Sequence, residues 1–379
     1  MAYTVLARRY RSQSFDEVIG QEGIARTLRN AIATNRVAHA YLFCGTRGVG
    51  KTTSARLFAK ELNGGSPEVD KAIMEGKDTD VIEIDAASNT GVDNARELIA
   101  NSMYRPLRGK HKVYIIDEVH MLSNAAFNAL LKTMEEPPEH VKFILCTTDP
   151  HKVPATIQSR CQRFDFRAIP VSLIAKHLGD VLKQEKVSAD PELLHQVAVL
   201  GNGSMRDALT LLDRLLASGE KKLTLKLLEE LLGLPDRKVV GGLIDALADG
   251  DAGKSLDLGR ALLDKGIAID QLIETLLMRL RDLMILAACG QKTPLVDLSD
   301  DARGEEFARA QRFDAAGLVH MIALCENVQR AAKHSGVPRV LLDALLVRLA
   351  MTEKLADVTA LIANGSSRPA LAGAAAKKA

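Results

Sequence analysis

The first part of the chain alternates short apolar runs with segments of helical periodicity. Five apolar runs between residues 40 and 166 have the length and composition of strands. They cover residues 40–44, 81–85, 113–117, 141–146 and, more weakly, 162–166. Strands that are apolar on both faces and separated by helices are typical of a parallel sheet covered on both sides. The pattern predicts an α/β domain with a five-stranded parallel sheet over residues 1–170.

One helix between these strands has clear start and stop signals. Ser123 can cap its start, and Pro137-Pro138 ends it. Its apolar positions share one face: Phe127, Leu130, Leu131 and Met134.

After Pro170 the strand pattern disappears and only helical periodicity remains. A break at Gly233-Leu234-Pro235 divides this region. We expect a small helical lid over 171–235 and an all-helical domain over 236–363, whose apolar positions suit a packed bundle or an oligomer interface. Residues 364–379 are expected to be disordered.

Composition adds few constraints. The chain of 379 residues is 47% hydrophobic, enough for a full core in two or three domains. Its formal net charge of +2 provides no global field for nucleic acid, so any DNA contact must be local. The five cysteines lie far apart with no C-x-x-C pair, which favours structural thiols over a metal site.

The N-terminal residues lack the apolar core of a signal peptide. No apolar run approaches the roughly 20 residues needed to cross a bilayer. The sequence therefore predicts a cytoplasmic protein without a membrane partner.

The segment after the first predicted strand matches the phosphate-loop pattern G-x-x-x-x-G-K-T, with a helix opening behind it. Glycines let backbone N–H groups approach phosphate oxygens at a helix N-terminus. Lys51 would bridge the β- and γ-phosphates, and the Thr52 hydroxyl would ligate Mg²⁺. The predicted ATP-binding residues here are Gly45, Thr46, Arg47, Gly48, Val49, Gly50, Lys51, Thr52 and Thr53.

Two carboxylates, Asp117 and Glu118, end the third predicted strand. In a parallel sheet this is the edge at which ligands bind. Asp117 would bind the hydration shell of Mg²⁺, and Glu118 would act as general base on the attacking water. Acidic residues at a strand end are also common as solvated turn residues, but the preceding phosphate loop favours the catalytic interpretation.

Thr148 follows the neighbouring strand, where its hydroxyl could orient water or sense the γ-phosphate. A threonine that merely favours strand geometry is the alternative. Arg160 and Arg206 look like ordinary surface arginines in the sequence alone.

Together these stretches resemble the AAA+ ATPases, and within them the family of gamma/tau subunits of bacterial DNA polymerase III, the motor of the clamp loader. The resemblance rests on residues 45–52, 116–122, 130–140 and Ser159-Arg160-Cys161. It is strong over about the first 235 residues and only architectural beyond them.

The resemblance implies a ring of ATPase subunits, completed by delta and delta-prime, that loads the sliding clamp on primer-template DNA. It implies that Arg160 is an arginine finger acting on a neighbouring subunit, and that Arg206 is a sensor of the γ-phosphate. The segment that encloses adenine would include Tyr10, Arg11, Val18 and Ile19. The helices after Pro235 would form the oligomerisation collar, and any DNA polymerase activity would belong to the holoenzyme and not to this chain.

The chain departs from the family in one respect. Family members usually carry a four-cysteine zinc module after the phosphate-loop helix, but residues 61–80 contain no cysteine. We therefore expect ATP and Mg²⁺ as cofactors and no zinc. The chain also lacks the further segments of the tau form, and resembles the short gamma form or a truncated chain.

Two other classes are weaker alternatives. A DNA-translocating AAA+ motor would carry a winged-helix segment after the lid, and a non-catalytic scaffold resembling delta-prime would have a degenerate phosphate loop; neither feature is present. A basic cluster before the third strand is either a solvated loop or a DNA contact: Arg105, Arg108, Lys110, His111 and Lys112.

Overall fold

The computed structural model describes residues 4–88, 99–296, 298 and 300–352. The chain divides into two compact units, Met1–Leu223 and Thr224–Ala379, and each is described by itself. The predicted divisions at residues 170 and 235 stay predictions, and the expected disordered tail lies outside the described residues.

The first unit is built around a parallel five-stranded sheet with the order β2-β3-β4-β1-β5. Its strands are β1 (Ala40–Cys44), β2 (Val81–Asp85), β3 (Lys112–Asp117), β4 (Val141–Thr147) and β5 (Gln162–Asp165). The predicted α/β fold is confirmed, and each predicted strand agrees with the observed one to within one residue. The sequence pattern succeeds here because strands buried on both faces are continuous apolar runs.

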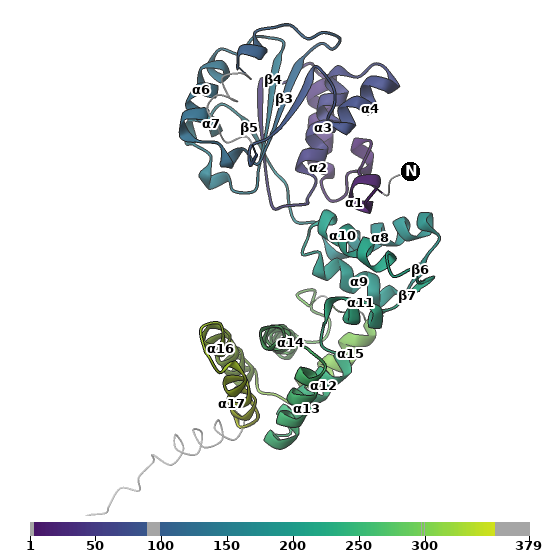
Figure 1. Cartoon of the computed structure of the whole chain (residues 1–379), viewed down its shortest axis with the longest axis vertical. Helices are drawn as coiled ribbons and strands as arrows, with labels where there is room; N and C mark the ends of the chain where they lie inside the picture. The colour runs from purple at the N-terminus through teal and green to yellow at the C-terminus, as the bar shows by residue number, and fades with distance from the viewer. Residues whose placement is uncertain (1–3, 89–98, 297, 299, 353–379) are drawn as a thin grey trace, which may run out of the picture. The chain divides into compact units, whose positions relative to one another are not determined.

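Helices cover both faces of this sheet (Figure 1). On one face Tyr41 and Phe43 pack with Phe58 of the phosphate-loop helix. On the other face Leu42 packs in a core with Leu130. The helices of this domain are α1 (Leu6–Arg9), η1 (Phe15–Glu17), α2 (Glu22–Ala33), α3 (Lys51–Asn63), α4 (Pro67–Glu75), η2 (Val119–Met121), α6 (Asn124–Glu135), η3 (Pro150–Lys152) and α7 (Ala155–Gln158).

The predicted helix after Ser123 is confirmed as α6. The Ser123 hydroxyl accepts a hydrogen bond from the backbone N–H of Ala126, so it caps the helix. Phe127, Leu130 and Met134 are buried, and Leu131 is partly buried against the same core.

Three helices follow the sheet within the first unit: α8 (Val171–Glu185), α9 (Pro191–Leu200) and α10 (Met205–Leu216). The prediction that no strand follows Pro170 was wrong in one detail. Two strands of two residues each form a parallel pair: β6 (Ser188–Ala189), which follows α8, and β7 (Lys222–Leu223), which follows α10. Two residues are too few to produce a readable alternation in the sequence.

The second unit is helical in all its described elements. They are α11 (Leu225–Leu232), α12 (Arg237–Ala248), α13 (Ala252–Asp264), α14 (Ile269–Cys289), α15 (Asp300–Ala310), α16 (Ala315–Ala332) and α17 (Pro338–Ala350). Apolar residues of α12 to α17 share one core, to which Leu276 and Leu280 of α14 and Leu346 of α17 belong.

Cysteine burial varies along the chain: Cys44, Cys146 and Cys325 are buried, whereas Cys289 is exposed. Within the described residues, no helix combines the length and apolar character required to cross a bilayer.

Candidate active site

The phosphate loop joins β1 to α3, which begins at Lys51. Gly48 and Gly50 have φ angles of 76° and 99°, a backbone conformation that glycine adopts without strain. Gly48 also has no room for a side chain, because a Cβ placed on it would lie 1.9 Å from the Ser204 hydroxyl oxygen. The loop therefore needs glycine at this position for both backbone conformation and packing.

Lys51 is only 6% exposed and lies inside this loop. Its ammonium group donates hydrogen bonds to the carbonyl oxygens of Gly45 and Thr46, at 2.7 and 2.8 Å. Burial lowers the pKa of Lys51, while the nearby Glu118 and Asp117 carboxylates oppose that shift. The loop thus holds a largely desolvated cation against two of its own carbonyl oxygens.

Asp117 ends β3 beside the first turn of α3. The Thr52 hydroxyl donates a 2.7 Å hydrogen bond to its carboxylate. Two oxygens at this separation, one a carboxylate oxygen and one a hydroxyl oxygen, are ligands of the type that Mg²⁺ prefers. The residues present therefore fit the predicted magnesium site.

Glu118 follows directly in a left-handed backbone conformation, with φ of 46° and ψ of 44°. Non-glycine residues adopt this conformation at a cost of about 1–2 kcal/mol, and such positions cluster at functional sites. The Thr148 hydroxyl, at the end of the neighbouring β4, donates a 2.9 Å hydrogen bond to Glu118 Oε2. The sheet thus joins two residues that lie 30 positions apart in the sequence.

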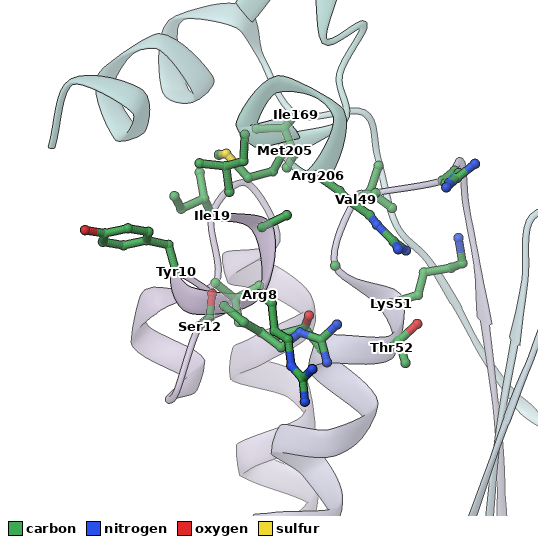
Figure 2. Close-up of a pocket in the computed structure, with 18 of the residues that line it drawn as sticks. Arg8, Tyr10, Ser12, Ile19, Val49, Lys51, Thr52, Ile169, Met205 and Arg206 are labelled. Carbon is green, nitrogen blue, oxygen red and sulfur yellow. The ribbon is translucent and has the colours of Figure 1, made fainter. Parts of the chain in front are cut away.

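A cavity of about 470 Å³ opens along the phosphate loop. Figure 2 shows residues of the loop, the N-terminal segment and the helix α10 around it. Most of the predicted nucleotide-binding residues line it: Tyr10, Arg11, Val18, Ile19, Arg47, Gly48, Val49, Gly50, Lys51, Thr52, Thr53 and Arg206, together with Asp117 and Glu118.

Sequence reasoning missed other lining residues. Arg8 and Arg56 add basic side chains to the cavity wall, and Ile169, Met205 and Leu209 add apolar surface to it. These residues belong to no recognisable motif, so only the folded chain identifies them.

Tyr10 contributes to the cavity wall with its ring directed away from Lys51 (Figure 2). Its hydroxyl donates a hydrogen bond to the Glu185 carboxylate of α8, and Arg9 forms an ion pair with the same group. These contacts attach the N-terminal segment to the helices that follow the sheet.

Arg206 is the second residue of α10, and its side chain extends toward the phosphate loop (Figure 2). Ser204 caps this helix by accepting a hydrogen bond from the Asp207 N–H at 3.1 Å. Since the same serine packs against Gly48, the start of α10 is fixed against the phosphate loop.

Arg160 lies outside the cavity wall. Its guanidinium group donates to Glu135 Oε1 of α6 and to the Thr156 carbonyl oxygen, both at 2.7 Å. The Arg160 side chain is 34% exposed, and the Glu135 side chain is 49% exposed. The predicted finger is therefore part of the protein surface and is held there by an ion pair.

The basic cluster before β3 is only partly exposed. Lys112 is buried, and its ammonium group donates to the Asn101 carbonyl oxygen at 2.7 Å. The Asp80 carboxylate accepts hydrogen bonds from three backbone N–H groups of the preceding turn, at Leu107, Arg108 and Gly109. Arg105, Arg108 and Lys110 remain exposed, so these three carry the DNA-contact alternative.

The parallel sheet, the phosphate loop between β1 and α3, and the helical lid against that loop define an AAA+ P-loop ATPase domain. Family models agree over nearly the whole chain. Residues 20–170 match a model of the DNA polymerase III delta subunit, 173–221 match the ATPase lid domain of a DNA polymerase III clamp loader subunit, and 223–364 match domain III of the DNA polymerase III subunits gamma and tau.

Curated relatives give the same result. The gamma subunit of DNA polymerase III from Buchnera aphidicola is 41% identical over 305 residues, which are 78% of this chain and 83% of that protein. The tau subunit from Bacillus subtilis is 40% identical over 93% of this chain and 64% of that protein. The tau subunit from Escherichia coli is 42% identical over 81% of this chain and 48% of that protein.

The chain belongs to the family of gamma and tau subunits of DNA polymerase III. It spans 64% and 48% of the length of the two tau subunits that it matches.

Proposed function

We propose that this chain is an ATP-hydrolysing motor subunit of a bacterial replicative clamp loader, which opens the sliding clamp and loads it on primed DNA. The observation that carries the proposal is the convergence of Lys51, Thr52, Asp117 and Glu118 on one cavity that the lid residue Arg206 also reaches. This set supplies phosphate binding, metal binding and water activation in one place.

ATP would bind with its triphosphate on the phosphate loop. The backbone N–H groups of residues 45–52 and the ammonium group of Lys51 would replace the water around the β- and γ-phosphates. Tyr10, Arg11, Val18 and Ile19 would enclose the adenine on the other side of the cavity. Arg206 would contact the γ-phosphate from the lid and so make lid position depend on the nucleotide.

Hydrolysis would require one carboxylate near the γ-phosphate and one near the metal. Thr52 and Asp117 would hold Mg²⁺, whose charge would offset the negative charge of the β- and γ-phosphates. Glu118 would accept the proton of the attacking water, and Thr148 would fix the Glu118 carboxylate through the 2.9 Å hydrogen bond. No zinc is part of this proposal.

Arg160 would act in trans. Since it lies outside the wall of its own cavity and on the surface, it is suited to stabilise the transition state on ATP bound by a neighbouring subunit. A single chain would then bind ATP well and hydrolyse it slowly.

The proposed partners follow from family membership. They are other copies of the gamma or tau type, the delta and delta-prime subunits, the sliding clamp and primer-template DNA. The helices of the second unit would form the oligomerisation collar of this assembly. DNA polymerase activity would belong to the holoenzyme and not to this chain.

Steady-state ATP hydrolysis tests the proposal. The chain is mixed with cognate delta, delta-prime and sliding clamp, and the rate is measured with and without primed DNA. We expect strong stimulation only when clamp and primed DNA are both present. A rate that does not respond to either would contradict the clamp-loader function, and would leave an AAA+ ATPase with another cargo.

A further inference from the structure

His120 lies next to Glu118, the proposed general base. It sits in η2, the short helical turn that follows Glu118, and its side chain is only 10% exposed. The imidazole Nδ1 is 3.0 Å from the Thr147 hydroxyl oxygen and 3.4 Å from Glu118 Oε2. A ring that is largely shielded from solvent, with one nitrogen near two oxygens, has a defined orientation.

The charges around the ring favour one tautomer. With the proton on Nε2, the lone pair of Nδ1 would face the Glu118 carboxylate at 3.4 Å, which is repulsive. With the proton on Nδ1, the N–H group donates to the Thr147 hydroxyl oxygen, and its partial positive charge lies near the Glu118 carboxylate. The Thr147 hydroxyl oxygen also accepts a hydrogen bond from the Asp149 N–H at 3.0 Å, so it is fixed in place.

Glu118 itself needs such support. Its left-handed backbone conformation is strained for a side chain with a Cβ, and strained positions persist only where their surroundings fix them. The Thr148 hydroxyl donates to Oε2 from one side, at 2.9 Å, and the His120 ring adjoins the same oxygen from another side. In the described part of the chain Oε1 receives no side-chain hydrogen bond, which leaves that oxygen for water.

We infer that His120 is a positioning residue for the ATPase reaction: its Nδ1–H group donates to the Thr147 hydroxyl oxygen and places positive charge 3.4 Å from Glu118 Oε2, and this attraction holds the carboxylate so that Oε1 faces the attacking water. His120 does not contact ATP in this role and lies outside the cavity wall. The inference rests on the proposed function, because it needs Glu118 as the base.

Two substitutions distinguish the effect of the N–H donor of His120 from the effect of its side-chain volume. In His120→Asn the amide nitrogen can occupy the place of Nδ1, whereas His120→Leu fills a similar volume without a donor. We expect His120→Leu to lower kcat of the assembled ring by about 10- to 100-fold, the range of a single supporting contact. ATP affinity should change by less than about 2-fold, because uniform binding is untouched. His120→Asn should retain most of the wild-type kcat.

A combined variant tests whether His120 acts through Glu118. In a chain that carries Glu118→Gln, adding His120→Leu should not lower the residual rate further, since residues that act as a unit are not additive. If His120 had only a structural role, His120→Leu would slow hydrolysis by the same factor in the wild-type chain and in the Glu118→Gln chain. His151→Leu, at an exposed histidine of the nearby η3, is the matched control and should leave kcat unchanged.

The outcomes distinguish a failure of the His120 role from a failure of the proposed function. Wild-type kcat in His120→Leu, an equal loss in His120→Asn and His120→Leu, or an additive loss in the combined variant would each overturn the role of His120 while Glu118→Gln stays inactive. If Glu118→Gln itself turned over at the wild-type rate, the proposed base would be wrong, and the inference would fail with it. Thermal unfolding of each variant verifies that the fold is intact.

Discussion

Lys51 and Arg160 are both basic residues with proposed contacts to ATP, but they occupy opposite environments. Lys51 is 6% exposed and bonded to carbonyl oxygens of its own loop, whereas the Arg160 side chain is 34% exposed and paired with the still more exposed Glu135. A buried cation with rigid neighbours is preorganised for a ligand that binds within the chain. A surface arginine with a replaceable partner suits a contact that forms and breaks between chains.

The same contrast extends to the surrounding elements. The side chains that accompany Lys51 come from the ends of β3 and β4, which are buried in the centre of the sheet. Arg160 follows α7, a helix of four residues, just before the outermost strand β5. Burial in the sheet fixes the first group, whereas contacts with Glu135 of α6 and Thr156 of α7 hold Arg160 at the surface.

The largest expected effect on ATP binding comes from Lys51→Ala, which removes the buried cation. We expect the Kd for ATP to rise at least about 100-fold, because the phosphates lose their partner in a desolvated loop. Titration of the full chain with a fluorescent ATP analogue measures this loss directly. Lys183→Ala, at an exposed lysine of α8, is the control and should bind like the wild type. An unchanged Kd in a folded Lys51→Ala chain would remove Lys51 from the site.

Arg160→Ala should leave binding intact and reduce hydrolysis. We expect kcat of the assembled ring to fall by about 10³-fold, the contribution of an arginine finger, and Arg160→Lys to fail as a replacement because it lacks the planar fork. The Kd of the isolated chain should stay the same. Arg163→Ala, at an exposed arginine paired with Asp165, is the matched control. A loss that appeared equally in the isolated chain would show that Arg160 acts in cis.

Gly48→Ala tests how closely the lid and the phosphate loop depend on each other. The new Cβ would lie 1.9 Å from the Ser204 hydroxyl oxygen. The alanine would also have to adopt the φ of 76° that Gly48 has. Left-handed backbone alone costs about 1–2 kcal/mol, so we expect ATP to bind at least about 10-fold more weakly. Gly65→Ala is the control, because no atom lies within 4 Å of its Cβ. Equal affinities in the two variants would contradict a close contact between lid and loop.

The sequence predicted where the buried half of the site lies in the fold, around Lys51, whereas the roles of its residues stay predictions. Strands that are apolar on both faces can be recognised in the sequence as continuous apolar runs. The phosphate-binding residues of the loop between β1 and α3 form one contiguous motif. The positions of Lys51, Thr52, Asp117 and Glu118 follow from that pattern, because parallel strands place their ends at one edge of the sheet.

Contacts between distant segments could not be predicted in the same way. The Arg160–Glu135 pair joins residues 25 positions apart, and the Ser204–Gly48 contact joins two domains of the predicted division. Neither has a periodicity or a composition signal, because each depends on how two elements pack. The helix α4 and the short strands β6 and β7 were missed for the related reason that short elements carry little pattern.

The smallest expected effect concerns the partner of Arg160. Glu135→Gln removes the charge of an exposed ion pair, and such pairs contribute about 0.2–1 kcal/mol. Since the proposed trans contact requires Arg160 to leave Glu135, the variant should raise kcat of the assembled ring by up to about 5-fold. The gain should shrink at high salt, which screens the wild-type pair as well.

Glu136→Gln is the matched control for this prediction, because Glu136 is also exposed and follows Glu135 directly. The sign of the Glu135→Gln effect decides between two uses of the ion pair. A higher kcat means that Glu135 competes with ATP of the neighbouring subunit for Arg160. A lower kcat would mean that Glu135 orients Arg160 before the subunits meet, and the exposed half of the site would then be preorganised in the same way as the buried half.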